Sequence, residues 1–197
     1  MKVDRPMRML ASFVATGLML GIAAPALAQN ANLATRSGHD LGVSLGSYKY
    51  TEWNNQGWGP INVTQAFAES SDTFFYQVAG MLGIDRLGYW AKQYGFGQQT
   101  GIDLPGEVAG TVPTNQWKLD VIGQAITPGE VYQAGIGQGY DVVTPIQLIT
   151  AYCALANGGK VYQPQVVKEI VGPDGSVVRP FAAKLVRKLP VPQSVLT

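Results

Sequence analysis

Apolar residues recur at helical spacing between residues 62 and 94. One stripe with the i, i+3, i+4, i+7 pattern predicts a helix from Asp72 to near Gly83. Asn62 predicts the start of a shorter helix through Glu69, because its side chain can accept a hydrogen bond from the first turn. The apolar side chains of the longer stripe are Phe75, Val78, Ala79 and Leu82.

A third helix is predicted directly after this stripe. Asp85 is expected to cap it, and Gly95 is expected to stop it. Its apolar stripe consists of Leu87, Trp90, Ala91 and Tyr94. We therefore expect a compact helical region with tight joints at 70–72 and 83–85.

The periodic pattern is lost over residues 95–139. Glycine and proline are frequent over residues 96–117, which favours loops and short extended pieces in that stretch. A helix is then predicted to start at Thr144, because Thr caps, Pro145 suits the first helical position and Gln147 can complete a capping box. Two apolar edges are expected on this helix, Ile146, Ile149 and Cys153 on one and Leu148, Tyr152 and Leu155 on the other. Asn157-Gly158-Gly159 is expected to end it.

The two ends of the body have a different pattern. Residues 161–171, the Pro-Asp-Gly turn at 173–175 and Val177-Val178 predict a β-hairpin. Residues 29–60 are polar and turn-rich, so we expect irregular structure with a short strand near 43–50. A helical region combined with antiparallel sheet elements favours a mixed α/β (α+β) fold.

Composition supports one globular domain. The 197 residues are 46 % hydrophobic, which is enough for a core, and the 24 glycines and 12 prolines disfavour a helical bundle. The formal net charge of +1 gives no sign of a nucleic-acid partner. The single Cys153 cannot form an internal disulfide, and with one histidine, His39, a structural zinc site is not expected.

Residues 1–28 are predicted to be a signal peptide. A basic start precedes an apolar run from Met9 to Ile22, and Ala26-Leu27-Ala28 is typical of a cleavage site. The alternative is an uncleaved membrane anchor, and only then would the protein contact a membrane. Both interpretations place the body outside the cytoplasm, exported to the periplasm or the outer face of the membrane.

Ser70 and Asp72 are the first candidates for chemistry. At a joint between two helices, the hydroxyl could relay a proton and the carboxylate could position a base or a substrate amide. Helix capping is the alternative, because Ser and Asp are favoured caps.

Three long stretches decide between these interpretations. They are AFAESSDTFFYQVAGMLGIDRL, GFGQQTGIDLPGEVAGTVP and GIGQGYDVVTPIQLITAYCALANGG, in this order. Together they resemble the transpeptidase domain of penicillin-binding proteins, and the S-x-D motif is similar to that of the class B, rod-shape enzymes of the penicillin-binding protein two type. The resemblance covers residues 57–197, whereas residues 29–56 match only weakly.

The resemblance implies a serine β-lactamase/transpeptidase-like fold, here partial, with a five-stranded antiparallel sheet and a helical subregion. It implies D,D-transpeptidase chemistry on D-Ala-D-Ala stem peptides, binding of β-lactams, cell-wall synthesis proteins as partners and no cofactor or metal. The family uses S-x-x-K, S-x-[ND] and K-[TS]-G, of which only the second can be carried over, to Ser70 and Asp72 as catalytic residues.

The 197 residues contain no serine followed three residues later by lysine, and no lysine followed by Thr-Gly or Ser-Gly. The chain therefore looks like the central part of a transpeptidase behind an export signal, and alone it is expected to be inactive. Two alternatives remain: an exported non-catalytic protein that binds the cell wall, and a truncated gene product without independent activity.

Other patterns are weaker. The glycine run 135–139 could suggest a phosphate cradle, but it is more simply a tight turn near the floor of the active site. Asp103, Glu107 and Asp120 could form a carboxylate set or a solvated surface. The four tryptophans could line a sugar groove, although packing is the simpler role, and His39 is most simply a surface residue. The tryptophans are Trp53, Trp58, Trp90 and Trp117.

Overall fold

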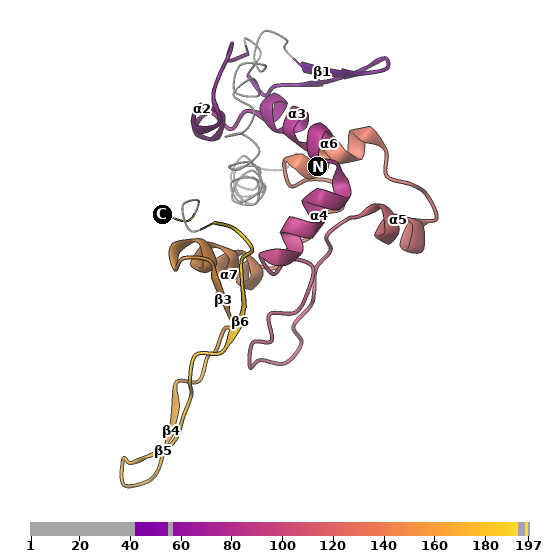
Figure 1. Cartoon of the computed structure of the whole chain (residues 1–197). Helices are drawn as coiled ribbons and strands as arrows, with labels where there is room; N and C mark the ends of the chain where they lie inside the picture. The colour runs from indigo at the N-terminus through magenta and orange to yellow at the C-terminus, as the bar shows by residue number, and fades with distance from the viewer. Residues whose placement is uncertain (1–41, 55–56, 193–195, 197) are drawn as a thin grey trace. The chain divides into compact units, whose positions relative to one another are not determined.

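The computed structural model describes residues 42–54, 57–192 and 196 (Figure 1). These residues belong to two units. The first unit contains 42–54, 57–90 and 113–141, and the second contains 91–112, 142–192 and 196. The first unit is therefore discontinuous in the sequence. The predicted signal peptide and His39 lie outside the described residues. Within the described ranges, no helix has both the length and the apolar character needed to cross a membrane.

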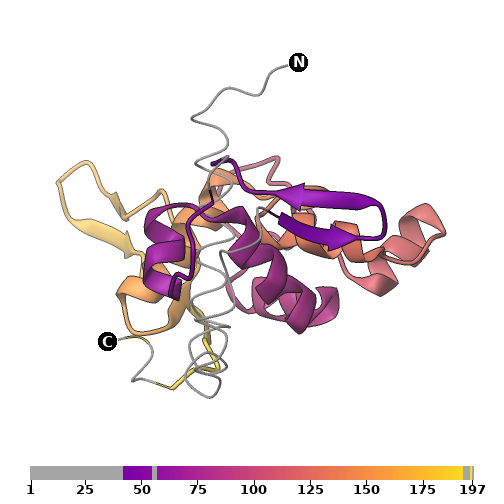
Figure 2. The same cartoon turned by 90° about the horizontal axis from the view of Figure 1, so that it is seen from above.

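The first unit opens with a hairpin, which Figure 2 shows as two indigo strands. Strand β1 (Gly42–Leu45) pairs antiparallel with β2 (Tyr48–Thr51), and Gly42 lies opposite Thr51. The structure therefore has extended backbone near 43–50 as expected, but as two short strands and not one. The turn residue Gly46 has a φ of 59°, which glycine adopts without steric cost, and it folds this stretch back on itself.

Helices α2 (Val63–Ala68) and α3 (Asp72–Leu82) confirm the sequence prediction, including the Asn62 cap of α2. Helix α4 (Ile84–Gln93) differs in one detail, because Asp85 lies inside its first turn and does not cap it. The Asp85 carboxylate instead accepts hydrogen bonds from the backbone N–H and side-chain amide of Asn115, both at 2.9 Å.

Two helices lie in the stretch where the apolar pattern is lost. Helix α5 (Asn115–Ile122) starts after the Thr114 cap, and helix α6 (Pro128–Gly135) starts after the Thr127 cap. The local reason for α6 is a capping box, in which Thr127 and Glu130 bond each other's backbone N–H groups. The prediction of loops over 96–117 is therefore wrong where α5 begins, and α6 lies in a stretch for which no element was predicted.

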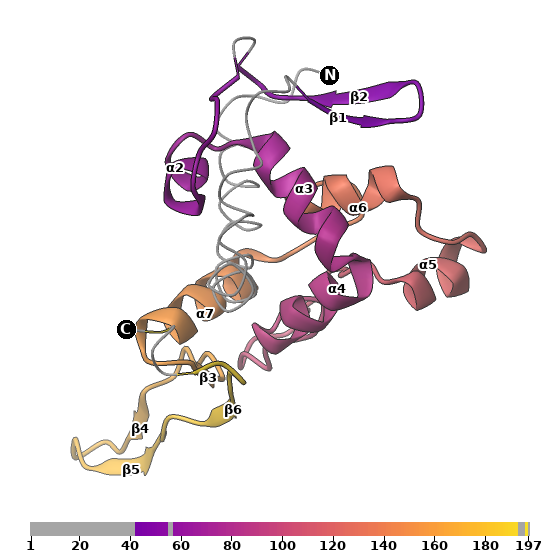
Figure 3. The ribbon, with the colours of Figure 1, turned by 45° about the horizontal axis from the view of Figure 1, so that its top comes forward.

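The core of the first unit lies where α6 packs on α3 (Figure 3). Gly135 makes this approach close, because a Cβ there would lie 2.4 Å from the Ala79 Cβ and 3.0 Å from the Phe75 carbonyl oxygen. The predicted α3 stripe is confirmed: Phe75, Val78 and Ala79 are buried and Leu82 packs beside them. The other buried members of this core are Ile61, Ala66, Phe74, Tyr76, Leu87 and Ile136.

The second unit contains helix α7 and two small sheets. Helix α7 (Pro145–Ala156) begins and ends where the sequence predicts. Its buried face is different, because Gln147, Thr150, Ala151 and Ala154 are buried whereas Ile149 and Cys153 are exposed. Apolar spacing alone was misleading here because polar side chains occupy the buried face.

The sheets of the second unit are both two-stranded and antiparallel. Strand β4 (Glu169–Val171) pairs with β5 (Val177–Pro180), which confirms the predicted hairpin. Strand β3 (Lys160–Tyr162) pairs instead with β6 (Leu185–Lys188), so Val161 is not part of that hairpin. The expected mixture of a helical subregion and antiparallel elements is confirmed, although the described strands form three two-stranded sheets and no five-stranded one.

Candidate functional site

The joint between α2 and α3 has an unusual backbone. Ser70 has a φ of 53° and is the one non-glycine residue in the described part of the chain with a positive φ. This left-handed conformation costs on the order of 1–2 kcal/mol for a residue with a Cβ, and such residues cluster at functional sites. The strain therefore falls on one of the two residues that the sequence singled out.

Capping of α3 falls to the neighbouring Ser71. Its hydroxyl accepts a hydrogen bond from the Phe74 N–H at 3.4 Å, and its side chain is almost fully buried. The Ser70 hydroxyl makes no hydrogen bond among the described residues. Capping and chemistry are therefore not competing explanations of Ser70, because the adjacent serine caps the helix.

Asp72 is the first residue of α3, and its side chain is half-buried. A carboxylate in the first turn is favoured by the partial positive charge of the helix N-terminus. The structure thus places Ser70 and Asp72 at one joint, with a hydroxyl just before the helix and a carboxylate at its first position.

Glu52 is the side chain at this joint that sequence reasoning missed. It follows β2 and is only 6 % exposed, yet it is a carboxylate. It accepts hydrogen bonds from the Ser71 hydroxyl at 2.7 Å, the Asp72 N–H at 2.8 Å and the Thr73 hydroxyl at 2.7 Å. The Thr73 N–H adds a longer one at 3.4 Å. No sequence motif links these positions, because the contacts join residues twenty apart.

Trp53 and Trp58 lie beside the same joint. The Trp53 indole N–H donates to the Glu69 carbonyl at 3.1 Å, and its ring lies 5.5 Å from that of Trp58. Trp90 packs against the core, and Trp117 contacts Tyr140 at 5.3 Å. The tryptophans therefore have different neighbours, and packing accounts for Trp90 as expected.

The glycine run 135–139 is a tight turn, as predicted, and its position disfavours a phosphate cradle. Gly135 is the last residue of α6, and the Gly137 and Gln138 N–H groups bond back to the carbonyls of Ala134 and Gln133. Anions are held at helix N-termini, whereas this turn is formed at a C-terminus.

The three candidate acids do not form one set. Glu107 accepts hydrogen bonds from Thr100 and Gly101, and Asp103 accepts them from Val166 and Val167. Burial raises the pKa of Glu107, but the hydrogen bonds outweigh this, and the net pKa is lowered. Asp120 belongs to the other unit and bonds Gln116. These contacts support local structural roles, and the described residues contain no cluster of three His, Cys, Asp or Glu side chains for a metal ion.

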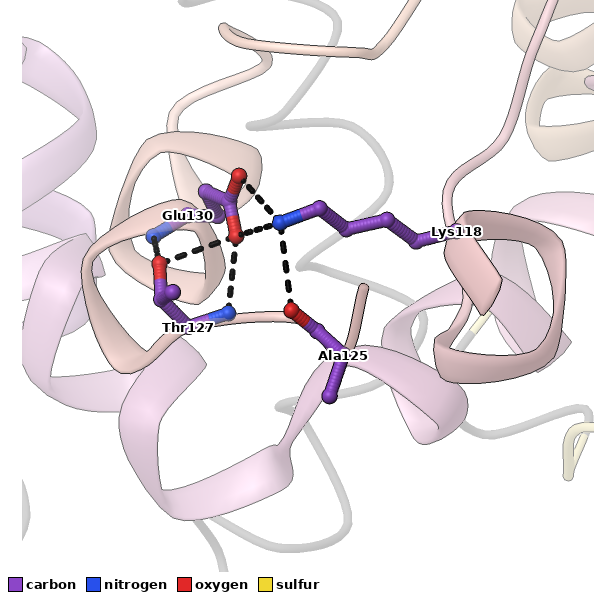
Figure 4. Close-up of polar contacts among 4 residues, drawn as sticks. All are labelled: Lys118, Ala125, Thr127 and Glu130. Carbon is purple, nitrogen blue, oxygen red and sulfur yellow. Dashed lines mark hydrogen bonds and ion pairs between the residues drawn. The ribbon is translucent and has the colours of Figure 1, made fainter. Parts of the chain in front are cut away.

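Lys118, which is buried, and Glu130, which is half-buried, form an ion pair between α5 and α6 (Figure 4). The Lys118 ammonium donates to both carboxylate oxygens at 2.6 Å and to the Ala125 carbonyl at 3.1 Å. Three acceptors occupy the three N–H bonds of the ammonium, so Lys118 is engaged as a structural cation and not as a free base. Burial raises the pKa of Glu130, but hydrogen bonds from Lys118 and Thr127 outweigh it and lower the net pKa.

Asp141 is a second acid that sequence reasoning did not single out. Its Oδ2 atom is buried and has no hydrogen-bond partner in the described part of the chain. Burial raises the pKa of this carboxyl to about 7. It therefore changes charge near neutral pH.

Comparison with known proteins identifies close relatives. Residues 19–197 match the family model of the penicillin binding protein transpeptidase domain. The peptidoglycan D,D-transpeptidase MrdA of Salmonella typhimurium is 48 % identical over 118 residues, which is 60 % of this chain and 19 % of the relative. The chain thus spans about a fifth of the length of this curated relative.

Solved structures agree with this match. The Pseudomonas aeruginosa PBP2 structure in complex with WCK 5153 has a TM-score of 0.75 and 32 % identity, covering 94 % of this chain and 41 % of that one. The Helicobacter pylori PBP2 structure in complex with MreC has a TM-score of 0.68 and 28 % identity, covering 88 % of this chain and 30 % of that one. These matches confirm the resemblance seen in the sequence.

Proposed function

Because this chain belongs to the penicillin-binding protein transpeptidase family, we propose that it supplies one wall of a peptidoglycan D,D-transpeptidase site, with Ser70 and Asp72 as its working side chains. The observation that carries the proposal is the α2–α3 joint. There Ser71 and Thr73 are bonded to Glu52, whereas the Ser70 hydroxyl makes no hydrogen bond among the described residues. Ser70 is thus the hydroxyl of this stretch that can turn to a ligand.

The chemistry of such a wall follows from the two groups. When a serine nucleophile attacks the carbonyl between two D-alanines, the leaving nitrogen must gain a proton. The Ser70 hydroxyl can pass that proton on, and the Asp72 carboxylate can accept a hydrogen bond from a substrate amide or a lysine ammonium. The 197 residues contain no S-x-x-K motif, so the proposed role is one wall and not the whole site.

Substrate, partner and location follow from the same proposal. The ligands are stem peptides that end in D-Ala-D-Ala, and the β-lactams that resemble them. The site works outside the cytoplasm, together with other cell-wall synthesis proteins. The Helicobacter pylori relative solved with MreC is one example of such an assembly.

A second candidate function is a cell-wall binding protein without catalysis. The absence of S-x-x-K and K-[TS]-G from these 197 residues favours it. Incubation of the chain with a fluorescent penicillin, followed by denaturing electrophoresis, tests both proposals against the alternative that this chain is a complete acylating enzyme. We expect no covalent band, and a band that survives denaturation would show a nucleophile that neither proposal includes.

Reversible binding tests the wall itself. Titration with an N-acyl-D-alanyl-D-alanine peptide, followed by NMR, should move the amide signals of Ser70 and Asp72. Ser70→Gly removes the hydroxyl and keeps the left-handed backbone accessible, so we expect binding to weaken roughly tenfold. Ser176→Ala removes a hydroxyl from the second unit and is the matched control. Equal affinities for the wild-type chain and both variants would contradict the role of Ser70.

A further inference from the structure

Glu52 is an acid buried without a cation. The residue is 6 % exposed, and no ion pair joins its carboxylate to a lysine, arginine or histidine among the described residues. Burial of an uncompensated charge is strongly unfavourable unless hydrogen bonds replace the lost water. Four donors from Ser71, Asp72 and Thr73 provide this compensation.

The four donor groups belong to three consecutive residues at the start of α3. Two of the donors are hydroxyls. The other two are backbone N–H groups of the first turn, which carry the partial positive charge of the helix N-terminus. Glu52 therefore holds the backbone that follows Ser70, and it also accepts hydrogen bonds from the Ser71 and Thr73 hydroxyls. The chain enters this arrangement through Ser70 itself, at a φ of 53°.

We propose that Glu52 is a positioning residue, which holds Ser70 in its left-handed conformation and Asp72 at the first position of α3. It acts through the backbone and through the Ser71 and Thr73 hydroxyls, and it does not contact the ligand. Its effect on ligand binding rests on the proposed function, whereas its effect on the backbone of the joint does not.

The second unit provides a matched control for a purely structural carboxylate. Glu107 accepts hydrogen bonds from the Thr100 N–H, the Thr100 hydroxyl and the Gly101 N–H. These donors are again backbone and hydroxyl groups from consecutive residues. Glu107 thus matches Glu52 in chemistry, but it belongs to the other unit.

The experiment compares Glu52→Gln and Glu107→Gln in the whole chain. Glutamine keeps the side-chain volume but replaces one acceptor oxygen with an NH₂ group, which faces donors at either position. NMR gives amide hydrogen exchange at Asp72 and Thr73 and the HN–Hα coupling of Ser70, which reports its φ. Titration with an N-acyl-D-alanyl-D-alanine peptide gives affinity, and thermal unfolding gives stability.

In Glu52→Gln we expect amide exchange at Asp72 and Thr73 to accelerate roughly tenfold or more, the Ser70 coupling to change, and the peptide to bind roughly tenfold more weakly. In Glu107→Gln, stability should fall while these three readouts stay at wild-type values. Unchanged exchange and coupling in Glu52→Gln would overturn the proposal. If the wild-type chain does not bind the peptide but the exchange and coupling effects are present, the positioning role is supported and the proposed function fails.

Discussion

Helices α3 and α7 start in two different ways. Each follows a hydroxyl cap, Ser71 for α3 and Thr144 for α7. At α7 the partner is local, because the Gln147 side chain accepts from the Thr144 N–H at 3.0 Å. At α3 the partner is Glu52, twenty residues before Asp72 in the sequence.

The difference shows what a distant partner allows. A local capping box uses the residues at the helix start for stability alone. At α3 the cap is Ser71, and the acceptor of its hydroxyl, Glu52, comes from another segment. Ser70 is therefore not needed as a cap and has a left-handed backbone. Helix α6 is intermediate, since its local box of Thr127 and Glu130 is reinforced by Lys118 from another helix.

Removal of the distant acceptor should have the largest effect. Glu52→Ala leaves two buried hydroxyls and two first-turn N–H groups without their partner, and we expect a loss of about 4 kcal/mol in the free energy of unfolding. Chemical denaturation of the wild-type chain and the variant measures it. Glu107→Ala should reduce the free energy of unfolding by less than half as much, because Glu107 is more exposed than Glu52. Equal losses in the two variants would contradict the contrast between the α2–α3 joint and an ordinary structural carboxylate.

Lys118→Met tests the intermediate case. The change leaves Glu130 partly buried without its cation, so we expect a loss of about 3 kcal/mol, seen in chemical denaturation. Lys49→Met, at an exposed strand position, should change stability little. Addition of Glu130→Gln to Lys118→Met should recover part of the loss, and no recovery would mean that the ion pair does not account for the effect.

Gln147→Leu tests the local cap. This fully buried amide also donates to the Gln98 and Ala109 carbonyls at 2.7 Å, so we expect a loss of about 2 kcal/mol in thermal or chemical unfolding. Thr144→Ala removes only the cap hydroxyl and should cost about 1 kcal/mol. A larger loss in Thr144→Ala would show that the cap outweighs the contacts to the 95–112 segment.

Acid should separate the charged cap from the neutral one. The pKa of Glu130 is lower in the folded chain than its ordinary value, so its contribution is present above the ordinary pKa and is lost as the pH falls through the folded pKa. The stability difference between the wild-type chain and Glu130→Gln should therefore shrink as the pH falls below about 4. A matching comparison with Gln147→Leu should give a difference independent of pH, and parallel curves for both pairs would contradict this.

The sequence predicts local features well and distant ones poorly. The start of α7 was predictable because Thr144, Pro145 and Gln147 lie within four positions. Thr127, Pro128 and Glu130 carry the same signal for α6, but no helix was predicted there because the apolar pattern fades over 95–139.

The site shows the same limit. Ser70 and Asp72 were recognised through family resemblance, and their catalytic role remains a prediction. Glu52 could not be found in this way, because its contacts depend on the β1–β2 hairpin returning to α3. No periodic pattern connects the end of a strand with the first turn of a helix twenty residues later.

The discontinuity of the first unit has a consequence for the order in which the protein is made. Helix α3 leaves the ribosome well before α6, and the 91–112 segment of the other unit is synthesised between them. The close packing of Gly135 against Ala79 can therefore form only late in synthesis. Until then the apolar face of α3 is not covered by α6. In addition, no single uninterrupted gene segment encodes the first unit alone.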